Sequence, residues 1–144
     1  MELELEASRE VHAPRDRCWE ILTDPGRAPE WLTIVDEAST DDAPGEGRII
    51  HARGGLLGVH VTTRQRVHLW EPRDRYGWCG DRPFPLTIEI TLTPVGQQRT
   101  RVDVRGHARP GRSFPVGGRL VRRAVRRQLS RSADNFVRVV RSDD

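Results

Sequence analysis

The chain has 144 residues and a formal net charge of +3, and no apolar run approaches the roughly 18 residues that a membrane-spanning helix needs. This length is typical of one domain that buries about two thirds of its unfolded surface. Because the sequence contains no Gly/Ser-rich linker and no repeat, we expect a single domain over residues 1–144. The acidic, alternating segment 1–6 differs from a signal peptide, so we expect a cytoplasmic protein.

All 24 basic side chains belong to arginine, and lysine is absent. This composition is typical of a GC-rich genome such as that of an actinobacterium. Cys18 and Cys79 are too few for a disulfide framework, and we expect both to be reduced.

The N-terminal part of the chain predicts one strand followed by short helices. Residues 2–11 alternate between polar and apolar side chains, as in a strand with one buried face, and Arg9 falls on the otherwise apolar face. Pro14 suits the first helical position, and apolar residues at i, i+3 and i+4 predict a two-turn amphipathic helix over 15–23. Two prolines then restrict the segment 25–32 to short helical turns.

The middle of the chain predicts six further strands, each with one polar and one apolar face, as in an antiparallel sheet that is covered on one side. In the longest of them, the odd-numbered residues from Leu57 to Leu69 are predicted to face the core. Gly54-Gly55 is a favourable hairpin sequence before this strand, and Pro94-Val95-Gly96 predicts another turn. The predicted strands span 34–39, 48–53, 57–69, 76–79, 86–93 and 100–109.

The C-terminal part predicts a Gly/Pro-rich connector over 110–118 and then a helix over about 119–141. Apolar residues recur on one side of this helix, and this stripe must pack on the sheet. Six arginines crowd into this stretch, and four of them, at positions 122, 123, 126 and 127, point largely away from that stripe. The stripe consists of Val121, Val125, Leu129, Phe136 and Val140, and the arginines stand at positions 119, 122, 123, 126, 127 and 131.

The order of these elements, with a set of short motifs, resembles the START-like (SRPBCC) superfamily, near its polyketide cyclase/dehydrase and lipid-transport group. The resemblance implies an α+β helix-grip fold. In that fold, a curved antiparallel sheet of about seven strands carries two short helices after strand 1 and is clasped by a long C-terminal helix. The motifs are Ala13-Pro14, Trp19, Asp24-Pro25, Glu30-Trp31, Gly45-Glu46-Gly47, Glu71-Pro72 and Thr100-Arg101-Val102.

A long helix across a curved sheet leaves a cavity, and polar or aromatic residues on its dry faces are candidate ligand contacts. Thr63 and Gln65 interrupt the apolar face of their strand, and Tyr76 and Trp78 share the inward face of the next. Trp31 would border the cavity mouth. Gln128 and Ser132 lie four residues apart beside the apolar stripe. A purely structural role stays open for each of these residues.

Candidates for chemistry are fewer. His51 is an acid–base candidate whose facing is unsettled, and Arg9 could pair with a carboxylate or enolate, or lie in solvent at a strand end. His60 and His68 are eight residues apart on one strand, roughly 26 Å, and cannot share a metal. With no Cys-x-x-Cys or His-x-x-x-His motif either, we expect no metal and no cofactor.

The sequence therefore predicts binding of a hydrophobic small molecule, with polyketide cyclase/dehydratase-like chemistry as the first expectation. A non-catalytic lipid or metabolite carrier or sensor is the alternative. The arginine-rich helix leaves contact with RNA or an anionic membrane surface as a third hypothesis, in which a nucleic acid is the less expected partner. The oligomeric state, monomer or homodimer, stays open.

Overall fold

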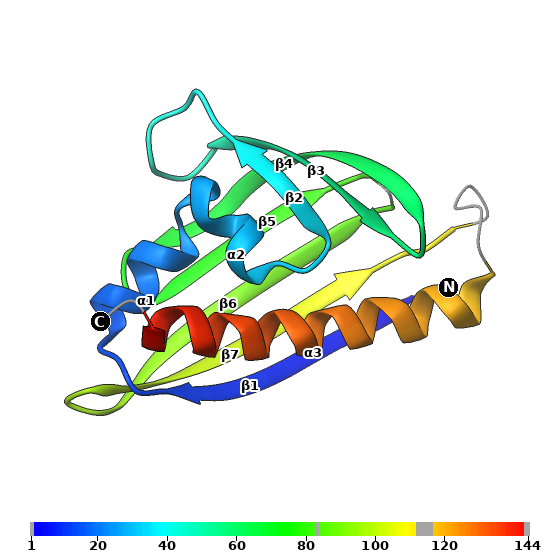
Figure 1. The fold of residues 1–144 in the computed structure, drawn as a ribbon. Helices are drawn as coiled ribbons and strands as arrows, with labels where there is room; N and C mark the ends of the chain where they lie inside the picture. Colours follow the sequence, from blue (N-terminus) through cyan, green and yellow to red (C-terminus); the bar gives the residue numbers. More distant parts are fainter. Residues whose placement is uncertain (1, 83, 112–116, 143–144) are drawn as a thin grey trace.

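A computed structural model describes residues 2–82, 84–111 and 117–142. It confirms the helix-grip fold: seven antiparallel strands form one sheet, and the long helix lies across one of its faces (Figure 1). The strands are ordered β1-β7-β6-β5-β4-β3-β2. Of the predicted connector, residues 112–116 lie outside the described residues.

The elements follow the predicted order, with small differences at their ends. Pro14, predicted at the first helical position, is instead the N-cap residue of the first helix. Pro94-Val95-Gly96, predicted to form a turn, lies at the end of a strand. The bounds are β1 Leu3–Val11, α1 Arg15–Leu22, η1 Pro25–Arg27, α2 Ala28–Trp31, β2 Val35–Ser39, β3 Ile49–Leu56, β4 Val59–Glu71, β5 Arg75–Gly80, β6 Leu86–Gly96, β7 Arg99–Ala108 and α3 Gly118–Ser142.

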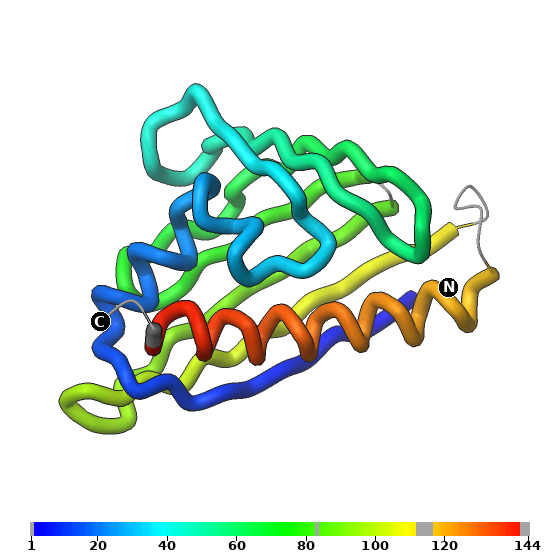
Figure 2. The backbone as a smooth tube through the Cα atoms, viewed as in Figure 1, coloured from blue at the N-terminus to red at the C-terminus, as the bar shows by residue number. Residues whose placement is uncertain are grey.

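The core lies between the concave face of the sheet and α3, and the tube in Figure 2 shows α3 running the length of β1. At the two ends of the helix, Val121 and Val140 are fully buried against the sheet, as the apolar stripe predicts. In the middle of the same stripe, Val125 and Leu129 are only half-buried. The helix is thus held at its ends over a region that side chains do not fill. None of the described helices is both long and apolar enough to cross a membrane.

The hairpin prediction at Gly54-Gly55 is wrong. β3 continues through both glycines to Leu56, and the turn consists of Leu57 and Gly58, with φ of 54° and 77°. A two-residue hairpin of this type needs positive φ at both central positions. Glycine is needed at position 54 for a different reason. A Cβ there would collide with the carbonyl group of Ile34, just before β2.

The facing predicted for Leu69 is also wrong. The register of β4 against β5 shifts between Val67 and Leu69, so that Val67 pairs with Trp78 but Leu69 pairs with Gly77. A β-bulge of this kind reverses the facing of every residue that follows it. Trp70 therefore packs against the core beside Tyr76, and Leu69, predicted to face the core, lies on the outer face.

Candidate functional site

The main cavity lies between α3 and the concave face of the sheet and has a volume of about 120 Å³. Its wall is almost entirely apolar, because β1, β6, β7 and α3 each turn their hydrophobic face toward it. The segment between α2 and β2 closes a further side. The apolar lining includes Leu5, Ile88, Ile90, Val104, Val125 and Leu129.

A second, smaller chamber of about 30 Å³ adjoins the main cavity toward α1 and η1. The two share Trp31, Gln65 and Trp78 as lining residues, and only the second is lined by Tyr76. Tyr76 and Trp78 pack with their ring centroids 5.6 Å apart. Both face inward, and the aromatic wall that they form suits a planar ligand.

Gln65 is the polar residue of the sheet at the junction of the two chambers. It pairs with Ile50 of β3, which points its buried side chain to the same face. Its half-buried amide forms no hydrogen bond with any residue that the structure describes. An amide without a partner on an apolar surface costs free energy, so this group is available to a ligand.

Trp31, at the end of α2, carries a second polar group without a described partner. Its side chain is 6% exposed and lines both chambers. The indole Nε1 is buried and has no acceptor among the described residues. The ring packs edge-to-face on Phe136 of α3, with centroids 5.2 Å apart, which fixes its orientation.

Gln128 and Ser132 of α3 also line the main cavity, but their hydrogen bonds go to the protein. The Thr33 backbone N–H donates to Ser132 Oγ over 3.1 Å, and the Thr33 hydroxyl donates to Gln128 Oε1. Thr33 was not predicted from the sequence, since nothing in the local pattern shows that residues 95 and 99 positions later lie beside it. These contacts join α3 to the segment between α2 and β2.

Arg9 lines the cavity, but its guanidinium is bonded to side chains of α3. Its guanidinium Nε donates to Asp134 Oδ1 over 2.8 Å, and Nη2 donates to Ser130 Oγ over 3.1 Å. The charge is therefore paired with a carboxylate of α3 at the edge of the cavity, and a ligand anion would have to displace that carboxylate.

His51 and Thr63 are not brought to the cavity. His51 is exposed on the face of β3 opposite the buried Ile50 and Ala52. Thr63 points to the concave face but lines neither chamber, and its buried hydroxyl has no partner among the described residues. Neither residue is positioned to touch a ligand in the two chambers.

Tyr76 is the titratable hydroxyl of the second chamber. Burial raises the pKa of Tyr76 to about 12, and the nearby charge of Arg48 opposes this shift only partly. The hydroxyl is thus protonated at neutral pH and can donate a hydrogen bond. Arg48 was not among the residues predicted to lie near the cavity. It stands two residues before Ile50, and residues two apart in a strand lie on the same face of the sheet, so alternation could have placed it beside Ile50.

The arrangement suits recognition better than acid–base or metal chemistry. No histidine is among the lining residues of either chamber. The described part of the chain contains no group of three His, Cys, Asp or Glu side chains that could hold a metal ion. What the chambers offer is apolar surface, aromatic rings and a few hydrogen-bonding groups.

This combination of fold and cavity agrees with a family comparison, in which residues 2–141 match the model described as polyketide cyclase/dehydrase and lipid transport. The chain belongs to this family. Both activities in that description concern hydrophobic ligands, which is the kind of molecule that the cavity fits. A comparison with curated proteins found no match.

Solved structures show the same fold at low sequence identity. A START superfamily protein from Mycobacterium smegmatis superimposes with a TM-score of 0.80 at 17% identity, over 95% of this chain and 96% of its own. The Zhui aromatase/cyclase from a Streptomyces species gives 0.71 at 18% identity, over 99% and 93%. A protein from Thermus thermophilus gives 0.74 at 18% identity, over 95% and 93%.

Proposed function

We propose that this protein binds a hydrophobic, ring-containing small molecule in the two chambers and that the ligand carries at least one polar atom. The observation that supports this most directly is the Gln65 amide, which stands in an apolar wall without a partner among the described residues. A ligand oxygen bonded to this amide would recover the free energy that its burial costs. The Trp31 indole N–H is a second donor without a described partner, but it is fully covered, so a ligand reaches it only when the neighbouring side chains shift.

The size of the cavity limits what it accepts as it stands. Binding pockets for drug-sized ligands commonly measure about 300–1,000 Å³, whereas a cavity of about 150 Å³ is enough for benzene. The main cavity of about 120 Å³ and the adjoining chamber of about 30 Å³ reach this size only together, so that the two hold a ligand of one ring. A polyketide or lipid would need the segment around Thr33 to move away from α3.

We infer polyketide cyclisation or dehydration as the candidate reaction, because one structural neighbour is by name an aromatase/cyclase and because Tyr76 lines the second chamber. A protonated phenol can polarise a substrate carbonyl, and a shaped apolar wall can hold a flexible chain in a reactive fold. No carboxylate–histidine pair lines the chambers, so positioning would supply most of the rate. A lipid or metabolite carrier would use the same cavity, and Tyr76 would then take no part in a reaction.

Binding can be tested with two probes that differ only by one hydroxyl group, p-cresol and toluene, titrated into the full chain and followed by NMR. We expect both to bind the wild type, and Gln65→Leu to weaken p-cresol about tenfold, the equivalent of one hydrogen bond, while toluene binds as well as before. Gln98→Leu, an exposed glutamine beyond β6, is the matched control and should change neither. If neither probe binds the wild type, the proposed ligand class is wrong.

Chemistry can be tested by incubating a poly-β-ketone with the wild type and with Tyr76→Phe. Altered product ratios with the wild type that revert in the variant would support cyclisation. If the ratios match those without protein although p-cresol still binds, the carrier function would be the better explanation.

A further inference from the structure

The N-terminal half of α3 carries a concentration of positive charge without partners. Its six arginines are all exposed, and none forms an ion pair or a hydrogen bond with a described residue. We call this surface the arginine face. It consists of Arg119, Arg122, Arg123, Arg126, Arg127 and Arg131.

Local stability does not explain the arginine face. The first turns of a helix favour negative charge, yet no acidic residue stands there and three arginines do. Several of these arginines are four positions apart, as Arg119 and Arg123 or Arg122 and Arg126 are, and like charges at this spacing repel. An external anionic partner would relieve both effects.

The acidic residues of neighbouring β1 cannot serve as that partner. Their side chains point to the outer face of the sheet, away from α3, and pair there with β7 and its surroundings. Arg109 Nη2 lies 2.7 Å from Glu2 Oε1, and Glu10 pairs with Arg99. The acidic and the unpaired basic groups are therefore on different sides of the molecule.

Exposed leucines accompany the arginine face. Leu120, in the first turn of α3, is 57% exposed, and Leu57, in the β3–β4 turn, is 44% exposed. Both Figure 1 and Figure 2 show that turn and the start of α3 at the same end of the molecule. Leu57 also has a positive φ of 54°, a conformation that leucine adopts at a cost and asparagine or glycine adopts readily. An apolar side chain therefore stands at the tip of this turn, although asparagine or glycine would fit the backbone conformation better.

We propose that the arginine face, Leu120 and the β3–β4 turn dock on an anionic lipid surface. Basic side chains around exposed apolar ones are the pattern of an interfacial helix, whose arginines pair with headgroups while the apolar groups enter the boundary. The opposite side of the same helical segment lines the cavity through Val125 and Leu129. Docking would place the cavity beside a source of hydrophobic ligand.

A nucleic acid fits this surface less well. Proteins that bind single strands combine basic grooves with aromatic rings on which bases stack. Among the described residues, every tryptophan, tyrosine and phenylalanine is buried or half-buried. The surface instead presents the exposed side chains of Leu57 and Leu120, which can enter the apolar boundary of a lipid layer.

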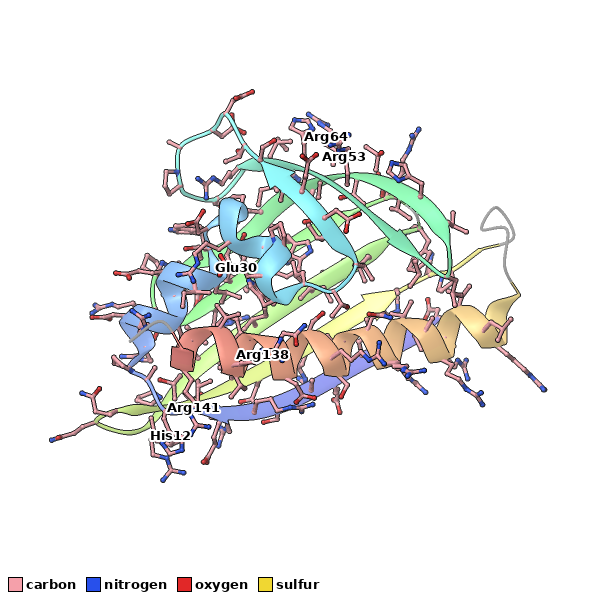
Figure 3. All side chains as sticks on the ribbon, viewed as in Figure 1. His12, Glu30, Arg53, Arg64, Arg138 and Arg141 are labelled. Carbon is pink, nitrogen blue, oxygen red and sulfur yellow. The ribbon has the colours of Figure 1, made fainter. Side chains whose placement is uncertain are left out.

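The test is flotation of the full chain with vesicles of phosphatidylcholine, with and without phosphatidylglycerol, at low and high salt. We expect binding to the anionic vesicles that salt weakens. Arg122→Gln/Arg126→Gln should reduce it about 25-fold, or about fivefold for each charge removed. The matched control is Arg64→Gln/Arg141→Gln, which removes two exposed, unpaired arginines that Figure 3 shows away from this end. The control should keep most of the binding.

Leu57→Asn tests the apolar contribution, because asparagine tolerates the positive φ and leaves the fold intact. It should weaken vesicle binding several-fold, whereas Val95→Asn, at an exposed position near the end of β6, should not. Equal binding to both kinds of vesicle, or equal loss in the matched variants, would overturn the proposal. RNA binding by the arginine face without vesicle binding would overturn it as well. Since p-cresol binding is measured without vesicles, failure here is distinct from failure of the proposed function.

Discussion

The backbone N–H of Thr33 donates a hydrogen bond to Ser132 Oγ over 3.1 Å, and the Thr33 hydroxyl lies 3.2 Å from the same oxygen. Ser132 is 4% exposed, so water does not compete well for this contact. With Gln128 and Thr33, it holds α3 against the segment between α2 and β2 at the side of the cavity. A ligand larger than the cavity has to break these bonds.

Ser132→Ala should destabilise the protein by about 1 kcal/mol, because it removes the buried acceptor of the Thr33 N–H and with it one tie between α3 and the segment before β2. Urea unfolding followed by tryptophan fluorescence measures this. Ser130→Ala is the matched control on the exposed side of α3, where the serine accepts a bond from Arg9, and should cost about 0.5 kcal/mol or less. Equal losses in the two variants would mean that the Thr33 contact does not hold the helix.

The hydroxyl of Tyr76 should lose its proton at a higher pH than an exposed tyrosine does. Tyr76 is the single tyrosine of the chain, so absorbance at the phenolate band reports its pKa directly, and we expect a midpoint near pH 12. The folded pKa lies above the unfolded value of about 10, so the stability that Tyr76 contributes is complete below pH 10 and is lost as the pH rises toward 12. The loss amounts to about 3 kcal/mol, and Tyr76→Phe should remove it. A midpoint near pH 10 in the folded protein would contradict burial of the hydroxyl.

Two adjacent glycines should lose very different amounts of stability when each is replaced by alanine. A Cβ at Gly54 would lie 1.6 Å from the Ile34 carbonyl oxygen, a backbone atom, whereas one at Gly55 would meet nothing closer than 3.4 Å. Gly54→Ala should cost at least about 3 kcal/mol or prevent folding, and Gly55→Ala about 1 kcal/mol or less. Urea denaturation of the two variants decides this. Similar stabilities would show that β2 does not approach β3 so closely.

The two cysteines should differ in reactivity. Burial raises the pKa of Cys18 to about 11 and leaves the side chain without solvent exposure, whereas Cys79 is half-buried in β5. Because the thiolate is the reactive form, iodoacetamide at pH 8 should modify Cys79 in the folded protein and Cys18 only in urea. Mass spectrometry after digestion locates the label. Modification of Cys18 without denaturant would indicate that α1 opens readily.

The order of the elements could be read from the sequence because their signals are local. Alternation over a few residues defines a strand and its dry face, and the spacing of apolar residues defines α3. The predictions of facing and of the hairpin failed where a single residue interrupts the regular alternation of a strand or occupies a turn that other residue types usually form. The bulge between Val67 and Leu69 exchanged the two faces of β4, and the turn at Leu57 lacks the usual asparagine or glycine.

The inward positions of Gln65, Tyr76 and Trp78 also followed from alternation alone. The partners of these side chains did not, since a hydrogen bond between residues about 100 positions apart leaves no trace in either local pattern. Only the tertiary structure could show that Gln128 and Ser132 bond to Thr33 while the Gln65 amide bonds to no described residue. Whether space remains beneath α3 was likewise decided by the packing of side chains from many separate elements, because a cavity depends on the distances between all of them rather than on any one segment.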